Sequence, residues 1–91
     1  MKEINPEWYP RVRPDILTES VEDEMVVYVP DTDQVHLLNL TAAAIYELCD
    51  GTLTVKDIIK VVKDSIGEIP ENIEEDIYKI LSEFNEKGLL K

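Results

Sequence analysis

The chain has 91 residues, of which 44% are hydrophobic, and it contains three glycines and one cysteine. This length suits one small domain with a modest core, and a single cysteine excludes an internal disulfide. Acidic residues outnumber basic ones by 20 to 9, giving a formal net charge of -11. Nucleic-acid binding is disfavoured, because it requires clustered Lys and Arg. Two interpretations of the acidic surface stay open: attraction of a basic peptide, or solubility alone.

The sequence has no apolar run that approaches the roughly 20 residues needed to span a bilayer. The first six residues also lack the apolar segment of a secretion signal. We therefore expect a cytoplasmic protein that does not contact membranes.

Residues 1–14 contain three prolines, Pro6, Pro10 and Pro14, which favour extended backbone and oppose a helix. Trp8 lies between them and offers a large apolar surface. We expect residues 1–14 to form an extended arm that docks onto a single domain made by residues 15–91.

Three segments rich in β-branched and aromatic residues follow, at 16–18, 25–29 and 34–38. Breaks at 22–24 and 30–33 separate them, which is typical of an antiparallel meander. We expect the third strand, 34–38, to lie at an edge, where its unpaired backbone groups must be covered or used.

Helical patterns occupy the rest of the chain. Asn39 and Thr41 are alternative N-caps of a short helix that ends at Gly51. A second helix begins at a capping arrangement, Thr54 to Asp57, and is expected to end near Gly67. Asn72 is the expected cap of a third helix, which ends before Gly88. Its apolar positions recur at intervals of three and four residues: Ile73, Ile77, Ile80, Leu81 and Phe84.

The predicted order is therefore β-β-β-α-α-α, an α+β fold of the winged-helix type with the sheet placed first. Residues suited to catalysis are few. His36 is the single histidine, and Cys49 lies in an apolar helical pattern, where cysteine packs as a small hydrophobe. No paired Cys or His ligands suggest a metal. We expect a protein that is not an enzyme and holds no cofactor or metal.

The acidic run from Glu68 to Asp76 admits two interpretations. It is either a site for a cation or basic peptide, or a solvated helix start that complements the helix dipole.

An edge strand beside a long helix forms a groove in which an extended peptide can add as a further strand. On the third helix, Glu74, Tyr78 and Leu81 lie to one side of a buried stripe centred on Ile73, Ile77, Ile80 and Phe84. If that side faces the strand, Tyr78 and Leu81 line the groove and Glu74 meets a basic residue. The alternative for Tyr78, an aromatic residue at the rim, is equally open.

Several segments of the chain resemble the PqqD family and, more broadly, the leader-recognition domains of systems that modify ribosomal peptides. They are Pro10 to Pro14 before the first strand, the junction Leu38 to Ala43, Leu48 to Thr52 with Thr54-Val55, and the closing segment Leu81 to Leu89.

This resemblance implies a non-catalytic chaperone that binds the leader of a precursor peptide and presents it to a modifying enzyme, often a radical S-adenosylmethionine enzyme, as in pyrroloquinoline quinone biosynthesis. It also implies a leader-binding groove between the third strand and the third helix. The corresponding residues here are Gln34, Val35, His36, Leu37, Leu38, Ile73, Glu74, Ile77, Tyr78 and Leu81.

The alternative functions are a winged-helix transcriptional regulator and another kind of protein-protein interaction module. The acidic third helix opposes the first of these. Either a monomer or a dimer is compatible with an exposed edge strand.

Overall fold

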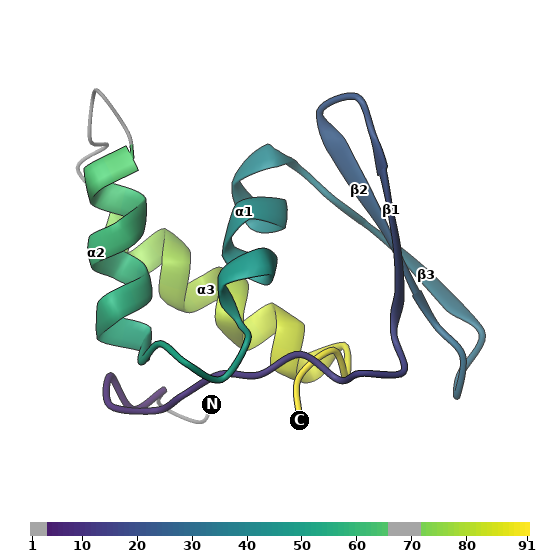
Figure 1. Cartoon of the computed structure of the whole chain (residues 1–91), viewed down its shortest axis with the longest axis horizontal. Coiled ribbons are helices and arrows are strands. Elements are labelled where there is room, and N and C mark those ends of the chain that lie inside the picture. The colour runs from purple at the N-terminus through teal and green to yellow at the C-terminus, as the bar shows by residue number, and fades with distance from the viewer. Residues whose placement is uncertain (1–3, 66–71) are drawn as a thin grey trace.

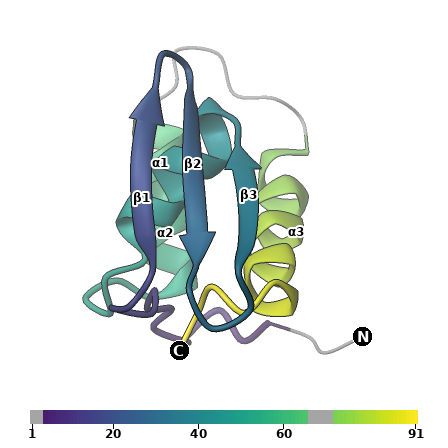
Figure 2. The same ribbon diagram turned by 90° about the vertical axis from the view of Figure 1, so that its right-hand side faces the viewer.

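A computed structural model describes residues 4–65 and 72–91. Three strands, β1 (Leu17–Val21), β2 (Glu24–Val29) and β3 (Gln34–Leu38), precede three helices, α1 (Leu40–Leu48), α2 (Val55–Ser65) and α3 (Ile73–Glu86). The helices gather on one side of the sheet (Figures 1 and 2). The predicted α+β fold is confirmed. The expected end of the second helix near Gly67, and residues 68–71 of the acidic run, lie outside the described residues.

The sheet is antiparallel in the order β1-β2-β3, so β3 is an edge strand, as predicted. Alternate residues of β2 explain its central place: Met25, Val27 and Val29 are buried against the helices. Both β1 and β2 reach further into the first turn than predicted, since Val21 pairs with Glu24, and the turn between them places Glu22 in a left-handed conformation with φ of 54°. Glu24, predicted as part of the break, opens β2.

Side chains cap the first two helices. Asn39 Oδ1 accepts from the Ala42 amide at 2.8 Å, which selects Asn39 over Thr41 as the α1 cap. Asp57 N donates to Thr54 Oγ1 at 3.1 Å while Thr54 N donates to an Asp57 carboxylate oxygen at 3.2 Å, so the capping arrangement is confirmed. Asn72 occupies the N-cap position of α3, as predicted, but its side chain makes no capping hydrogen bond.

The core lies between the sheet and the helices and includes Ile45, Ile58, Ile77 and Leu81, each fully buried. Cys49 is buried as predicted, and its Sγ lies 3.2 Å from the Ile45 carbonyl oxygen. Burial raises the pKa of this thiol to about 12. Cys49 therefore remains protonated and packs as a hydrophobe.

The N-terminal segment joins parts of the domain that are far apart in sequence. Trp8 packs against the core, and its carbonyl accepts from the Val55 amide at 2.8 Å. Val12 forms a β-bridge with Leu90, next to the fully buried Leu89. Docking of Trp8 onto the domain is thus observed, while the division between residues 14 and 15 stays a prediction. In the described part of the chain, none of the helices has the length and apolarity to cross a bilayer.

Candidate functional site

The free side of β3 is the first component of the candidate site. Among the described residues, β3 pairs only with β2, so no strand covers its other side, and α3 belongs to the layer of helices behind the sheet (Figures 1 and 2). Val35 and Leu37 are 60% and 64% exposed, whereas Leu38 is buried in the core. The strand therefore offers backbone donors and acceptors at an edge and two apolar side chains to the solvent.

The remaining strand residues of the predicted site differ in their surroundings. Gln34 is exposed at the start of β3. His36 lies opposite Val27, on the face of the sheet that packs on the helices, and is half-buried. Its Nε2 atom is buried and has no hydrogen-bond partner among the described residues. A buried polar atom without a hydrogen-bond partner lowers the stability of the folded protein, so the His36 side chain is destabilising at this position.

A hollow of about 390 Å³ lies between the start of α1, which directly follows β3, and α3. Its α1 side is formed by Asn39, the cap of the helix, and by Thr41 in its first turn. Its helix side is formed by one face of α3: Ile73, Asp76, Lys79, Ile80 and Glu83. The hollow thus combines an apolar surface with two carboxylates and one ammonium group, which suits an apolar side chain next to a basic one.

The structure brings only some of the predicted helix residues to this hollow. Ile73 lines it. Ile77 and Leu81 are fully buried in the core, so they support the groove from below and do not line it. Glu74 and Tyr78 line a different cavity, between α2 and α3. The prediction that Glu74, Tyr78 and Leu81 face the strand is therefore not met by the geometry.

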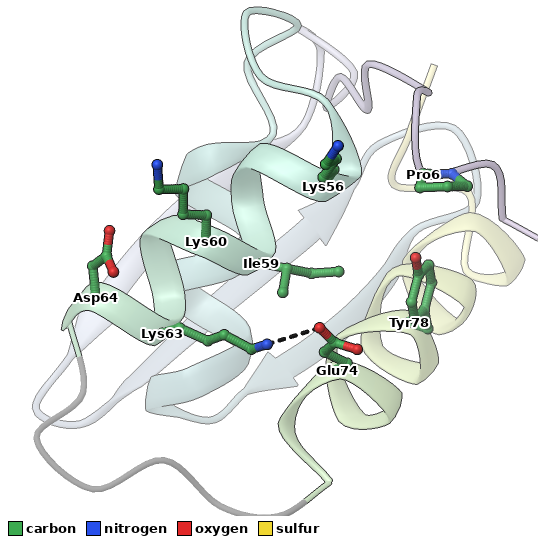
Figure 3. Close-up of a pocket in the computed structure, with 8 residues that line it drawn as sticks. All are labelled: Pro6, Lys56, Ile59, Lys60, Lys63, Asp64, Glu74 and Tyr78. Carbon is green, nitrogen blue, oxygen red and sulfur yellow. Dashed lines mark hydrogen bonds and ion pairs between the residues drawn. The ribbon is translucent and has the colours of Figure 1, made fainter.

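The α2-α3 cavity has a volume of about 310 Å³ (Figure 3). Glu74 reaches across it to Lys63 of α2, with an Nζ to Oε1 distance of 2.7 Å. Tyr78 and Ile59 form its apolar part, and Pro6 of the N-terminal segment lies at one end. Glu74 therefore pairs with a basic residue of the protein itself, on the side of α3 that faces α2.

Sequence reasoning missed four residues of α3 that line the hollow beside β3: Asp76, Lys79, Ile80 and Glu83. Ile80 was placed at the centre of the buried stripe, yet it is only half-buried, whereas Leu81 is fully buried. The stripe is therefore rotated toward Leu81. A usable signal was present: Asp76, Ile80 and Glu83 recur at helical spacing and form an apolar position flanked by acids.

A three-stranded sheet with β1 and β3 at its edges, followed by three helices, defines a small module of the winged-helix type. Residues 24–90 match the family model described as "Coenzyme PQQ synthesis protein D (PqqD)". The chain belongs to the PqqD family. A comparison with curated protein sequences gives no match.

Two solved structures have similar folds, and both were determined with a leader peptide. "TbiB1 in Complex with the TbiA(beta) Leader Peptide" is 17% identical, with a TM-score of 0.76, over 89% of this chain and 94% of that one. "Lasso peptide synthetase B1 complexed with the leader peptide" is 25% identical, with a TM-score of 0.75, over 92% of this chain and 99% of that one. The resemblance to the PqqD family inferred from the sequence is thus confirmed.

Proposed function

We propose that this protein binds the leader segment of a ribosomal precursor peptide along β3 and presents the peptide to a modifying enzyme. The observation that carries the proposal is the free edge of β3, which lies beside a hollow lined by α3. A peptide strand at this edge satisfies the free backbone groups and places side chains against α3. Membership of the PqqD family, and the leader peptides in both similar structures, support this function.

The protein itself contributes binding and not chemistry in this proposal. The thiol of Cys49 is buried and protonated, so it is a poor nucleophile. The modifying enzyme supplies the reaction, and a radical S-adenosylmethionine enzyme of pyrroloquinoline quinone-type biosynthesis is the partner that we infer from the family. Family membership leaves the precursor and the product open.

A winged-helix transcriptional regulator is the alternative, and the charge of α3 weighs against it. The first turn of α3 holds three acidic residues, and its last turn holds no basic residue. A helix that enters a DNA groove approaches phosphates, which such a helix repels. The structural neighbours also favour peptide binding, because both were solved with leader peptides.

Titration of a labelled leader from the adjacent precursor gene tests the proposed function. Leu37→Pro removes a backbone donor from β3 and should abolish binding or weaken it by at least about tenfold. Leu17→Pro makes the same change on β1, the opposite edge of the sheet, and should leave leader affinity unchanged. Thermal unfolding of both variants shows whether each remains folded.

Substitution of a residue that lines the hollow provides a second test and leaves β3 unchanged. Ile80→Gln places a polar side chain in the hollow and should weaken leader binding, whereas Tyr78→Gln alters the α2-α3 cavity and should not. Absence of leader binding by the wild-type protein at tens of micromolar, with the modifying enzyme present, would contradict the proposal. Retained leader affinity in a folded Leu37→Pro variant would argue against strand addition.

A further inference from the structure

The sheet has an outer face that no helix covers. This face points toward the viewer in Figure 2, with the helices behind it. Residues directly opposite each other on paired strands share a face, so the register defines two cross-strand rows. One row is Leu17, Tyr28 and Val35, and the next is Glu19, Val26 and Leu37.

Five residues of these rows form an apolar patch, here called the outer-face patch: Leu17, Val26, Tyr28, Val35 and Leu37. Three of them are strongly exposed, Leu17 at 61%, Val35 at 60% and Leu37 at 64%. A group of large apolar side chains on neighbouring strands differs from scattered surface leucines and is typical of an interaction site. The register therefore shows that these apolar side chains form one continuous group on the open face of the sheet.

The charged residues that the sheet and its turns contribute around the outer-face patch are all acidic. The sequence contains no Lys or Arg between Arg13 and Lys56. The sheet and its turns carry seven acidic residues: Asp15, Glu19, Glu22, Asp23, Glu24, Asp31 and Asp33. Arg13 pairs with Asp15 at 2.6 Å and also with Asp31. The other five have no cationic partner among the described residues, so carboxylates surround the apolar centre.

This arrangement matches the anatomy of a protein interface, an apolar centre within a polar rim. A carboxylate rim is complementary to Lys and Arg, and such complementarity selects the partner and speeds encounter. A second copy of this chain carries the same carboxylates and is therefore repelled. We propose that the outer-face patch docks the modifying enzyme through a surface of that enzyme with an apolar centre and a basic rim. This inference rests on the proposed function.

The outer-face patch includes two residues of β3, the strand along which the leader is proposed to bind. A peptide that adds to β3 extends the sheet by one strand and leaves the outer face open. Alternate side chains of that added strand project from the same face, next to Val35 and Leu37. An enzyme on this face contacts both the protein and the bound leader. Leader binding and enzyme binding are then coupled, and each strengthens the other by the same factor.

A leucine substitution on β1 separates enzyme docking from leader binding. Leu17 lies two strands away from the free edge of β3. Leu17→Ser should weaken binding of the purified modifying enzyme from the same gene cluster by about tenfold, with leader affinity unchanged. Leu40→Ser is the matched control, because Leu40 is 67% exposed but begins α1. It should leave the affinity for the enzyme unchanged.

A charge substitution tests the rim independently. Glu19→Lys reverses one charge beside Val26 and Leu37, and should weaken enzyme binding several-fold at low salt. Glu47→Lys makes the same change on α1 as a control and should have a smaller effect. Enzyme affinity of the wild-type protein should also fall as salt is raised.

Three results would overturn the docking proposal. One is an affinity for the enzyme that is unchanged in both Leu17→Ser and Glu19→Lys. Another is an equal loss of enzyme affinity in Leu17→Ser and Leu40→Ser. The third is sedimentation showing that the wild-type protein dimerises and that Leu17→Ser abolishes only the dimer. The enzyme titration is also run without leader. If the wild-type protein does not bind the leader, the proposed function is refuted. If it binds the leader but Leu17→Ser leaves enzyme affinity unchanged, only the docking surface is refuted.

Discussion

Glu74 of α3 forms an ion pair with Lys63 of α2, with the two charged atoms 2.7 Å apart. The pair marks the side of α3 that faces α2. Ile73, Asp76 and Ile80 lie on another side of the helix, where they line the hollow next to the start of α1.

The two carboxylates Asp76 and Glu74 should respond differently when a basic leader is titrated. Asp76→Asn removes a charge from the hollow and should weaken binding by about threefold at low salt. Glu74→Gln removes a charge that already pairs with Lys63 and should leave leader affinity unchanged. The measurement is the dissociation constant of each variant at two salt concentrations. The opposite order of effects would mean that the α3 face with Glu74 binds the leader.

Two asparagines at helix starts form a matched pair for stability measurements. Asn39→Ala removes the cap of the Ala42 amide and should lower the free energy of unfolding by about 1 kcal/mol. Asn72→Ala should cost much less, because that side chain makes no capping hydrogen bond. Urea unfolding of both variants provides the comparison, and equal losses would show that the Asn72 side chain also caps its helix.

Stability should decrease at alkaline pH because of Cys49. Its thiol has a pKa near 12 in the folded protein, against an ordinary value of 9.0. Below pH 9 the thiol is protonated in both states and the full stability is present. Between these two values only the unfolded thiol ionises, which lowers the free energy of unfolding by up to about 1.4 kcal/mol per pH unit.

Cys49→Ala is the control for this pH dependence. The variant loses packing and is less stable at neutral pH, but its stability should fall less steeply above pH 9. The remaining slope has a contribution from Tyr46, whose pKa is also raised by burial. Parallel curves for the variant and the wild-type protein would show that Cys49 ionises normally in the folded state.

His36 offers a test of an unsatisfied polar atom in the sheet. His36→Leu removes the buried Nε2 atom that has no partner among the described residues, and should raise the free energy of unfolding by about 1 kcal/mol. His36→Gln keeps a polar side chain at this position and should bring no gain. A loss of stability in His36→Leu would mean that solvent or another group satisfies the imidazole.

The features that were predictable from the sequence are those fixed within a few residues. The cap at Asn39 and the reciprocal bonds of Thr54 and Asp57 need only a side chain and a nearby amide, and both are present. The antiparallel meander was predicted for the same local reason, from the breaks that separate its strands. Asn72 shows the limit, because a residue type that favours capping does not ensure the hydrogen bond.

The orientation of α3 about its own axis was not predictable. Ile80 and Leu81 are adjacent apolar residues, so two stripe centres fit the sequence equally well. The choice depends on packing against the sheet and on contacts with α2, including the pair of Lys63 and Glu74. These contacts join residues far apart in sequence, so the α3 residues that line the candidate site could not be identified from the helical pattern alone. The edge position of β3, which depends on topology alone, was predicted, whereas the orientation of α3 was not.

The bridge between Val12 and Leu90 has a consequence for the order of events during synthesis. The Arg13 amide donates to Leu89, and the Lys91 amide donates to Arg11, so residues 11–13 are held by residues 89–91, which are translated much later. Such contacts form late, because they join residues far apart in sequence. The β-hairpins can pair on the ribosome, but closure of the N-terminal segment over the core must await the emergence of residues 89–91 from the ribosome.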